Sequence, residues 1–233
     1  MTTPATTAAK TTGIWEDFVD IFYAPSQVFE RRRAGQFGLA LAILTVLMTV
    51  VFFVTKGGLQ PVMDAEFQRK AAEAMAKNPK LTMEQMEKGR AMFEKFGFLA
   101  VLVGTPLRVC IVALLLWVGG KLAGATGPLA PAMMVSTYAH VPRVLESLLA
   151  GVQGLLLNPD SITSRYSVTL SAARFLDPTT TNPMLLRLAG QVDVFSIWVA
   201  VLLALGLSVV GRIPRGRAAA VAAVIWIVGA LFG

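Results

Sequence analysis

The chain has 233 residues, of which 55% are hydrophobic and only 15% are charged, and its mean hydropathy is +0.63. Soluble domains carry about 25% charged residues, so this composition excludes an ordinary soluble domain. It indicates an integral membrane protein of the all-α class, in which lipid surrounds a polytopic helix bundle. The formal net charge is +7.

The first 36 residues predict a cytoplasmic tail that contains an amphipathic helix. Apolar side chains recur at helical spacing from residue 14, and acidic side chains fall opposite them. The apolar set is Ile14, Trp15, Phe18, Ile21 and Phe22, and the acidic set is Glu16, Asp17 and Asp20. The pattern favours a short helix packed on the bundle at the membrane interface. The alternative is a helix that docks a partner.

Residues 37–233 predict a membrane domain of five helices, with four as the alternative count. The segments are 37–54, 98–118, 129–157, 194–210 and 214–232. A membrane helix needs about 20 residues, and the third segment is long enough to tilt or to kink at Pro142, which lacks an N–H. The first apolar run has no small-residue cleavage site, so we expect it to remain in the mature protein.

Residues 56–97 predict a helical hairpin inserted between the first two membrane helices. One arm is an alanine-rich stretch of mixed charge, and Asn78-Pro79-Lys80 turns the chain. Thr82 and Gln85 have the spacing of a capping box, and the helix that they start can continue into segment 98–118. A solvated structural hairpin is the favoured interpretation, with a lid over a ligand as the alternative.

The arginine clusters predict the orientation of the bundle. With five helices, the cluster before the first helix and the cluster between the last two fall on one side, which the positive-inside rule makes cytoplasmic. The N-terminus is then inside. The hairpin is predicted outside, yet it carries eight Lys/Arg against six acids, which opposes this orientation. The clusters are Arg31, Arg32 and Arg33, and Arg212, Arg215 and Arg217.

A group of polar residues interrupts the apolar segments and is the candidate site. Ionisable residues in a membrane helix need partners, a wet cavity or a role. Arg108–Glu146 and Arg143–Glu146 are competing ion pairs, because Glu146 is the only acid within a predicted membrane segment. The group is either a structural seam between helices or a water-filled pocket for a headgroup or ion. Its members are Arg108, Tyr138, His140, Pro142, Arg143 and Glu146.

No pattern in the sequence predicts catalysis or a cofactor. His140 is the only histidine and no cysteine cluster accompanies it, so a transition-metal site is not expected. The G-x-S-x-G, H-E-x-x-H and phosphate-loop motifs are missing from the sequence, and no aspartate lies in a predicted membrane segment. We therefore expect no enzyme activity, no cofactor, no metal and no nucleic-acid partner.

Three motifs resemble the bacterial branch of the Yip (Ypt/Rab-interacting protein) membrane family. The first is Pro25-x-x-x-Phe29, the second is residues 138–145, and the third is Asp193-x-Phe195-x-x-Trp198 followed by Gly206. The resemblance implies five membrane helices and a cytoplasmic N-terminus. It also implies a role related to membrane trafficking or shaping, since the eukaryotic members are associated with Rab-type GTPases.

From the residues and this resemblance together we expect a non-catalytic scaffold or membrane-organising protein. Its expected location is a bacterial inner membrane, and its expected partners are the bilayer and possible membrane proteins or further copies of itself. The alternative function is a small transporter or channel that uses Arg108, His140, Arg143 and Glu146. The two hypotheses differ in whether water and solutes reach the polar cluster.

Overall fold

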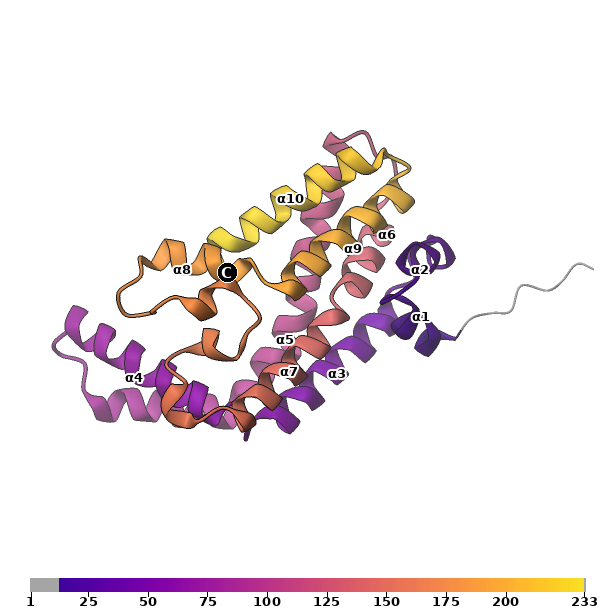
Figure 1. Cartoon of the computed structure of the whole chain (residues 1–233). Coiled ribbons are helices and arrows are strands. Elements are labelled where there is room, and N and C mark those ends of the chain that lie inside the picture. Colours follow the sequence, from indigo (N-terminus) through magenta and orange to yellow (C-terminus); the bar gives the residue numbers. More distant parts are fainter. Residues whose placement is uncertain (1–12, 233) are drawn as a thin grey trace, which may run out of the picture.

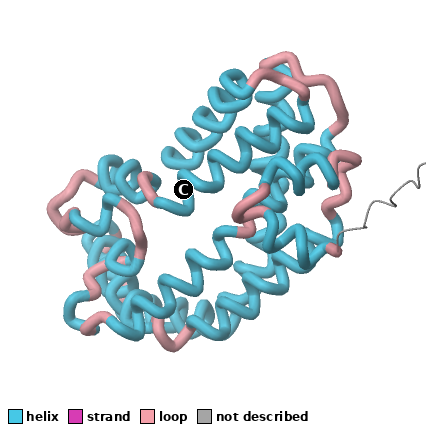
Figure 2. The backbone as a smooth tube through the Cα atoms, turned by 45° about the vertical axis from the view of Figure 1, so that its right-hand side comes forward, coloured by secondary structure: helices cyan, strands magenta, loops and turns pink. Residues whose placement is uncertain are grey.

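The computed structural model describes residues 13–232, and within that range it contains helices and loops but no strand (Figure 2). Residues 1–12 of the predicted tail and Gly233 lie outside the described residues. The chain begins with two short helices, α1 (Ile14–Asp20) and α2 (Pro25–Arg31). Pro25 opens α2 because its fixed φ suits the first helical turn, where no N–H is needed.

Within residues 13–232, three helices are long and apolar enough to cross a bilayer, with mean hydropathies of 2.5, 2.4 and 2.4 over their most apolar windows. They are α3 (Gly38–Thr55), α5 (Met83–Leu122) and α9 (Val194–Gly211). Less than two fifths of each window is buried inside the protein, which leaves much of their apolar surface available to lipid. The full count of five remains a prediction.

The third predicted membrane segment is divided into two helices, α6 (Leu129–Ala139) and α7 (Pro142–Leu156). The kink expected at Pro142 is therefore an interruption at His140 and Val141, both of which keep right-handed helical backbone angles. Pro142 cannot donate the hydrogen bond that would continue α6, and it opens α7 instead. At 1.5 Å per residue the two helices are only about 17 and 23 Å long, so neither crosses a bilayer alone.

The predicted hairpin is present and projects to one side of the bundle, opposite α1 and α2 (Figure 1). It pairs α4 (Gln60–Lys77) with the first turns of α5, which continues through Pro106 as one helix of 40 residues. The capping box also forms, because Thr82 Oγ1 accepts from Gln85 N at 3.3 Å and Gln85 Oε1 accepts from Thr82 N at 3.1 Å.

Between α7 and α9 the chain makes short turns and one helix on the outer surface of the bundle. The helix α8 (Pro183–Gln191) starts at Asn182, whose side chain accepts from the amides of the first turn. It packs on α10 (Arg215–Phe232), which runs back along α9 (Figure 1). The turns are the 3-10 segments η1 (Pro159–Ser161), η2 (Arg165–Val168) and η3 (Ala172–Phe175).

Close backbone contacts place both arginine clusters at the same end of the bundle. A Cβ on Gly35 would lie 2.8 Å from Ala130, so the residues after the first cluster lie against the start of α6. Arg217 from the second cluster donates to the carbonyl of Ala123, 3.4 Å away, just before that helix.

The packing of α9 on α6 depends on a small residue. Gly206 of α9 touches the Val135 side chain so closely that a Cβ there would collide with it, as small residues allow between membrane helices.

Candidate functional site

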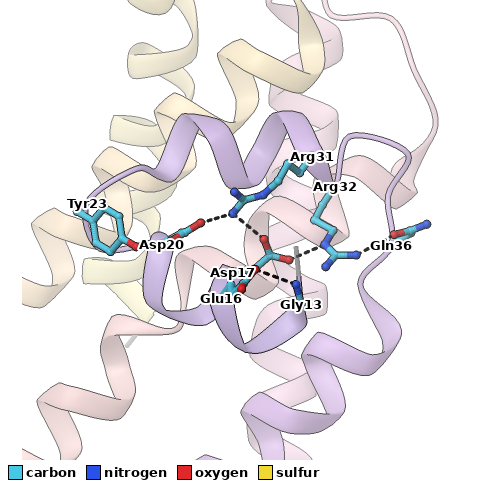
Figure 3. Close-up of polar contacts among 8 residues, drawn as sticks. All are labelled: Gly13, Glu16, Asp17, Asp20, Tyr23, Arg31, Arg32 and Gln36. Carbon is cyan, nitrogen blue, oxygen red and sulfur yellow. Dashed lines mark hydrogen bonds and ion pairs between the residues drawn. The ribbon is translucent and has the colours of Figure 1, made fainter. Parts of the chain in front are cut away.

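The first polar cluster ties α1 to α2 around a carboxylate that is closed to solvent. Asp17 is fully buried, and its two oxygens accept from Arg31 Nη2 at 2.8 Å and Arg32 Nε at 2.6 Å (Figure 3). Arg31 also bonds Asp20 at 2.5 Å. A buried carboxylate is tolerated when it is paired and hydrogen-bonded, so these arginines allow α1 to bury its acidic side.

The amphipathic pattern therefore predicted the wrong exposed face for part of α1. Asp17 was expected among the exposed acids but is 0% exposed, whereas Trp15 was expected in the apolar face and is 62% exposed. The physical reason is a charge partner from outside the helix. Arg31 and Arg32 follow 14 and 15 residues later and fold back over α1, which hydropathy along α1 alone does not reveal.

Aromatic contacts attach the same region to the membrane helices. The rings of Phe18 and Tyr138 meet edge to face with centroids 5.8 Å apart, and those of Phe22 and Trp198 meet at 5.3 Å. Phe195 stacks on Trp198 at 6.4 Å, and Phe29 of α2 is fully buried. The aromatic positions of the three sequence motifs thus pack around one junction between the N-terminal helices, α6 and α9.

A second polar cluster lines a cavity of about 620 Å³ between α5, α7, α8, α9 and α10. A smaller cavity of about 260 Å³ shares Arg108, Arg143 and Glu146 with the larger one. His140 lines the larger cavity only. The structure therefore brings four of the six predicted site residues together. Tyr138 instead faces α1, and Pro142 serves to start α7.

The ion pairs within this cluster leave one cation in excess. Arg143 Nη1 lies 2.6 Å from Glu146 Oε2, and Arg143 Nη2 donates to Ser196 Oγ at 3.1 Å. Of the two competing pairings, Arg143–Glu146 is the one that forms. Arg108 has no hydrogen bond or ion pair with any residue in the range 13–232.

Further polar groups around the cavity come from segments that hydropathy treats as connections. Arg165 of η2 and Arg187 of α8 line it, together with Asp193 at the start of α9. Asp193 Oδ1 caps α9 by accepting from Phe195 N at 2.8 Å, while its Oδ2 is buried without a partner. The sequence analysis did not place Arg165 or Arg187 in the candidate site, and their positive charge was the available signal.

The cavity is closed toward the end that carries the arginine clusters. None of the described residues 116–139 or 204–221 lines it. At that level Leu116, Val135 and Leu207 are buried in the main apolar core. The cavity is therefore a recess within the bundle and does not extend through it. Within residues 13–232, no group of three His, Cys, Asp or Glu side chains could hold a metal ion.

Apolar spanning helices around a polar recess define a multi-pass α-helical membrane protein. The family model of the Yip1 domain matches residues 19–233, and the chain belongs to this family of membrane proteins. The match begins at the last two residues of α1, so it includes α2 and the bundle but little of α1. Neither a curated protein nor a solved structure matches the chain.

Proposed function

We propose that this protein is a non-catalytic scaffold that organises a bacterial inner membrane by docking a partner protein on α1 and α2. The proposal rests on the way in which α1 is attached to the helix bundle. Asp17 and the aromatic contacts hold it firmly against the bundle, and its exposed side carries the large apolar groups of Trp15 and Val19 beside the carboxylate of Glu16.

The exposed surface of α1 and of the turn that follows it has the composition of an interaction surface. Trp15, Val19 and Tyr23 recur every four residues and are 62%, 58% and 70% exposed. Aromatic residues are enriched where proteins meet partners or the membrane interface, because they bury large areas while ordering few rotatable bonds. A rigid helix that presents such a stripe pays little entropy on docking.

The proposed orientation places the N-terminus in the cytoplasm. Support comes from the contacts of Gly35 with Ala130 and of Arg217 with Ala123, which bring both arginine clusters to one end. Under the positive-inside rule that end is cytoplasmic. The hairpin α4–α5 leaves the bundle near the far ends of α3 and α7, so its cations do not add to that end.

A site-specific photo-crosslinker at Tyr23 of the full chain in inner membranes tests the docking role. We expect a discrete protein adduct that disappears when Trp15→Ala and Val19→Ala are combined, while the melting temperature of the protein is kept. A crosslinker at Phe175, which is 87% exposed on η3, is the control and should give no such adduct. Adducts with lipid alone at Tyr23 would contradict protein docking.

A small transporter or channel is the second candidate function, and the cavity lined by Arg108, His140, Arg143 and Glu146 favours it. The full chain in liposomes should leak ions and small solutes no faster than protein-free liposomes if the scaffold role is correct. A flux that Glu146→Gln abolishes, while the protein remains folded, would replace the scaffold role with transport. We expect no enzyme activity in either case.

A further inference from the structure

Arg108 lies in a position that calls for an anion from outside the chain. It sits about 15 Å along α5 from the start of the apolar stretch at Phe98, since a helix rises 1.5 Å per residue. No ion pair or hydrogen bond with residues 13–232 compensates its charge. A cation at membrane depth is costly unless it is paired or hydrated, and Arg108 borders both cavities.

The larger cavity is rich in hydrogen-bond donors and in positive charge. Four arginines line it against two carboxylates, one of which is already paired with Arg143. Arg143 Nε and Trp226 Nε1 are also buried without acceptors. Arginine matches the geometry of phosphate oxygens particularly well. The donors therefore favour a ligand with phosphate chemistry. The arginines are Arg108, Arg143, Arg165 and Arg187.

The wall of the cavity indicates that such a ligand arrives from the bilayer. Leu107, Ile111 and Leu115 follow one side of α5, and all three both line the cavity and are exposed on the protein surface, by 56%, 49% and 38%. The opposite wall includes the apolar α10 residues Ile225 and Val228. A molecule with a charged head and apolar chains fits this combination, because its chains can remain along α5 while its head reaches Arg108.

We propose that the cavity binds the phosphate headgroup of an anionic phospholipid that enters sideways from the membrane, with Arg108 as its main counter-charge. The buried Oδ2 of Asp193 has no partner and can accept from a hydroxyl of a glycerol headgroup. A volume of about 620 Å³ lies within the usual range of small-molecule sites, about 300–1,000 Å³. The site does not depend on the scaffold role.

Thermal unfolding of the purified full chain in neutral detergent tests the site. Phosphatidylglycerol, phosphatidylcholine or inorganic phosphate is added separately to the wild type, Arg108→Gln and Arg215→Gln. Only phosphatidylglycerol should raise the melting temperature of the wild type, because a ligand that binds the native state stabilises it. For Arg108→Gln, the same rise in melting temperature should require about tenfold or more phosphatidylglycerol, as expected for losing a hydrogen bond to a charged group.

The matched control is Arg215→Gln, which removes an exposed arginine outside both cavities and should respond like the wild type. Arg187→Gln removes a second lining arginine from the exposed surface of α8 and should also weaken the response. This variant keeps the test decisive if Arg108→Gln does not fold.

Four results would overturn the proposal. Equal stabilisation by phosphatidylcholine would show that the headgroup charge is not recognised, and stabilisation by inorganic phosphate without phosphatidylglycerol would identify a soluble anion as the ligand. An unchanged response of Arg108→Gln and Arg187→Gln would exclude the cavity as the site. If Arg108→Gln instead altered the oligomeric mass and kept the lipid response, a second copy would supply the counter-charge.

Discussion

Two groups of charged side chains lie within this helical protein, and they are built in opposite ways. Around Asp17 a fully buried carboxylate meets two arginines, so every charge has a close partner. Around Arg108 the one paired acid is already used by Arg143, and the excess cation borders a cavity. The first group is complete without a ligand, whereas the second leaves Arg108 without a close charge partner among residues 13–232.

This difference separates the structural and functional uses of charge in one bundle. A complete ion cluster specifies how α1 and α2 dock, and its removal should therefore cost stability. A cluster with an unpaired charge contributes less to the stability of the fold, and its removal should mainly change what the protein binds. The sequence alone groups Arg108 with Tyr138 in one candidate site, but the structure assigns Tyr138 to the docking of α1.

The largest effect should follow from Asp17→Asn, which leaves two guanidinium groups facing a neutral amide. Removing one partner of a buried ion pair costs about 3–5 kcal/mol, with the lower value expected because Arg31 and Arg32 are 29% and 21% exposed. Thermal unfolding in detergent and proteolysis of α1 measure the effect. Glu16→Gln, which alters an exposed side chain, is the control, and equal losses in both variants would undo the distinction.

A smaller loss, about 1–2 kcal/mol, is expected from Glu146→Gln. The variant weakens a charged hydrogen bond to Arg143, but both side chains are 22–25% exposed and water in the cavity can replace part of it. The same unfolding measurement applies, with Glu84→Gln in the exposed pair with Lys88 as a control. A loss as large as that of Asp17→Asn would mean that the second cluster is structural too.

The sign of the effect should reverse for Arg108→Gln without added lipid. Removing an uncompensated charge from an apolar helix relieves its desolvation cost, so the variant should be as stable as the wild type or more stable by about 1 kcal/mol. Unfolding in neutral detergent decides this. Destabilisation comparable to that of Glu146→Gln would show that Arg108 already has a structural partner in the bundle.

The smallest effect on stability is expected at Glu66, a carboxylate of α4 that lies outside the spanning segments. Burial alone would raise the pKa of Glu66, but bonds from the Arg165 amide at 3.0 Å and from Arg69 at 2.9 Å outweigh it, and the pKa lies below its ordinary value of 4.5. A lowered pKa in the folded state contributes stability above the unfolded pKa and loses it as the pH falls.

Acidification below about pH 4.5 should therefore loosen the contact between α4 and η2. Hydrogen exchange at the Arg165 amide measures this contact directly. Glu66→Gln should abolish the pH dependence at that amide, because the variant cannot titrate. An unchanged pH profile in Glu66→Gln would assign the effect to other acids of the hairpin, such as Glu94, whose pKa the Arg90 side chain also lowers.

Much of the fold follows from local patterns in the sequence. The capping box at Thr82 and Gln85 correctly predicted the start of α5, and the apolar runs predicted α3 and α9, because these signals depend on neighbours along one helix. Pro142 predicted a kink at the point where the structure has an interruption. The sequence underestimated the size of this interruption, because the apolar run continues across it and does not show that α6 and α7 are separate helices.

The membrane class, the principal spanning helices, the hairpin and the family motifs were determined by the sequence itself, because hydropathy and helix signals act over a few residues. Only the tertiary structure decided that Asp17 is buried, that Glu146 pairs with Arg143, and that Arg108 faces a cavity. The Asp17 cluster joins residues 14 and 15 positions apart, and the Arg143–Glu146 pair forms within α7. The energy of an ionisable group depends on which of the available partners folding brings within a few ångströms.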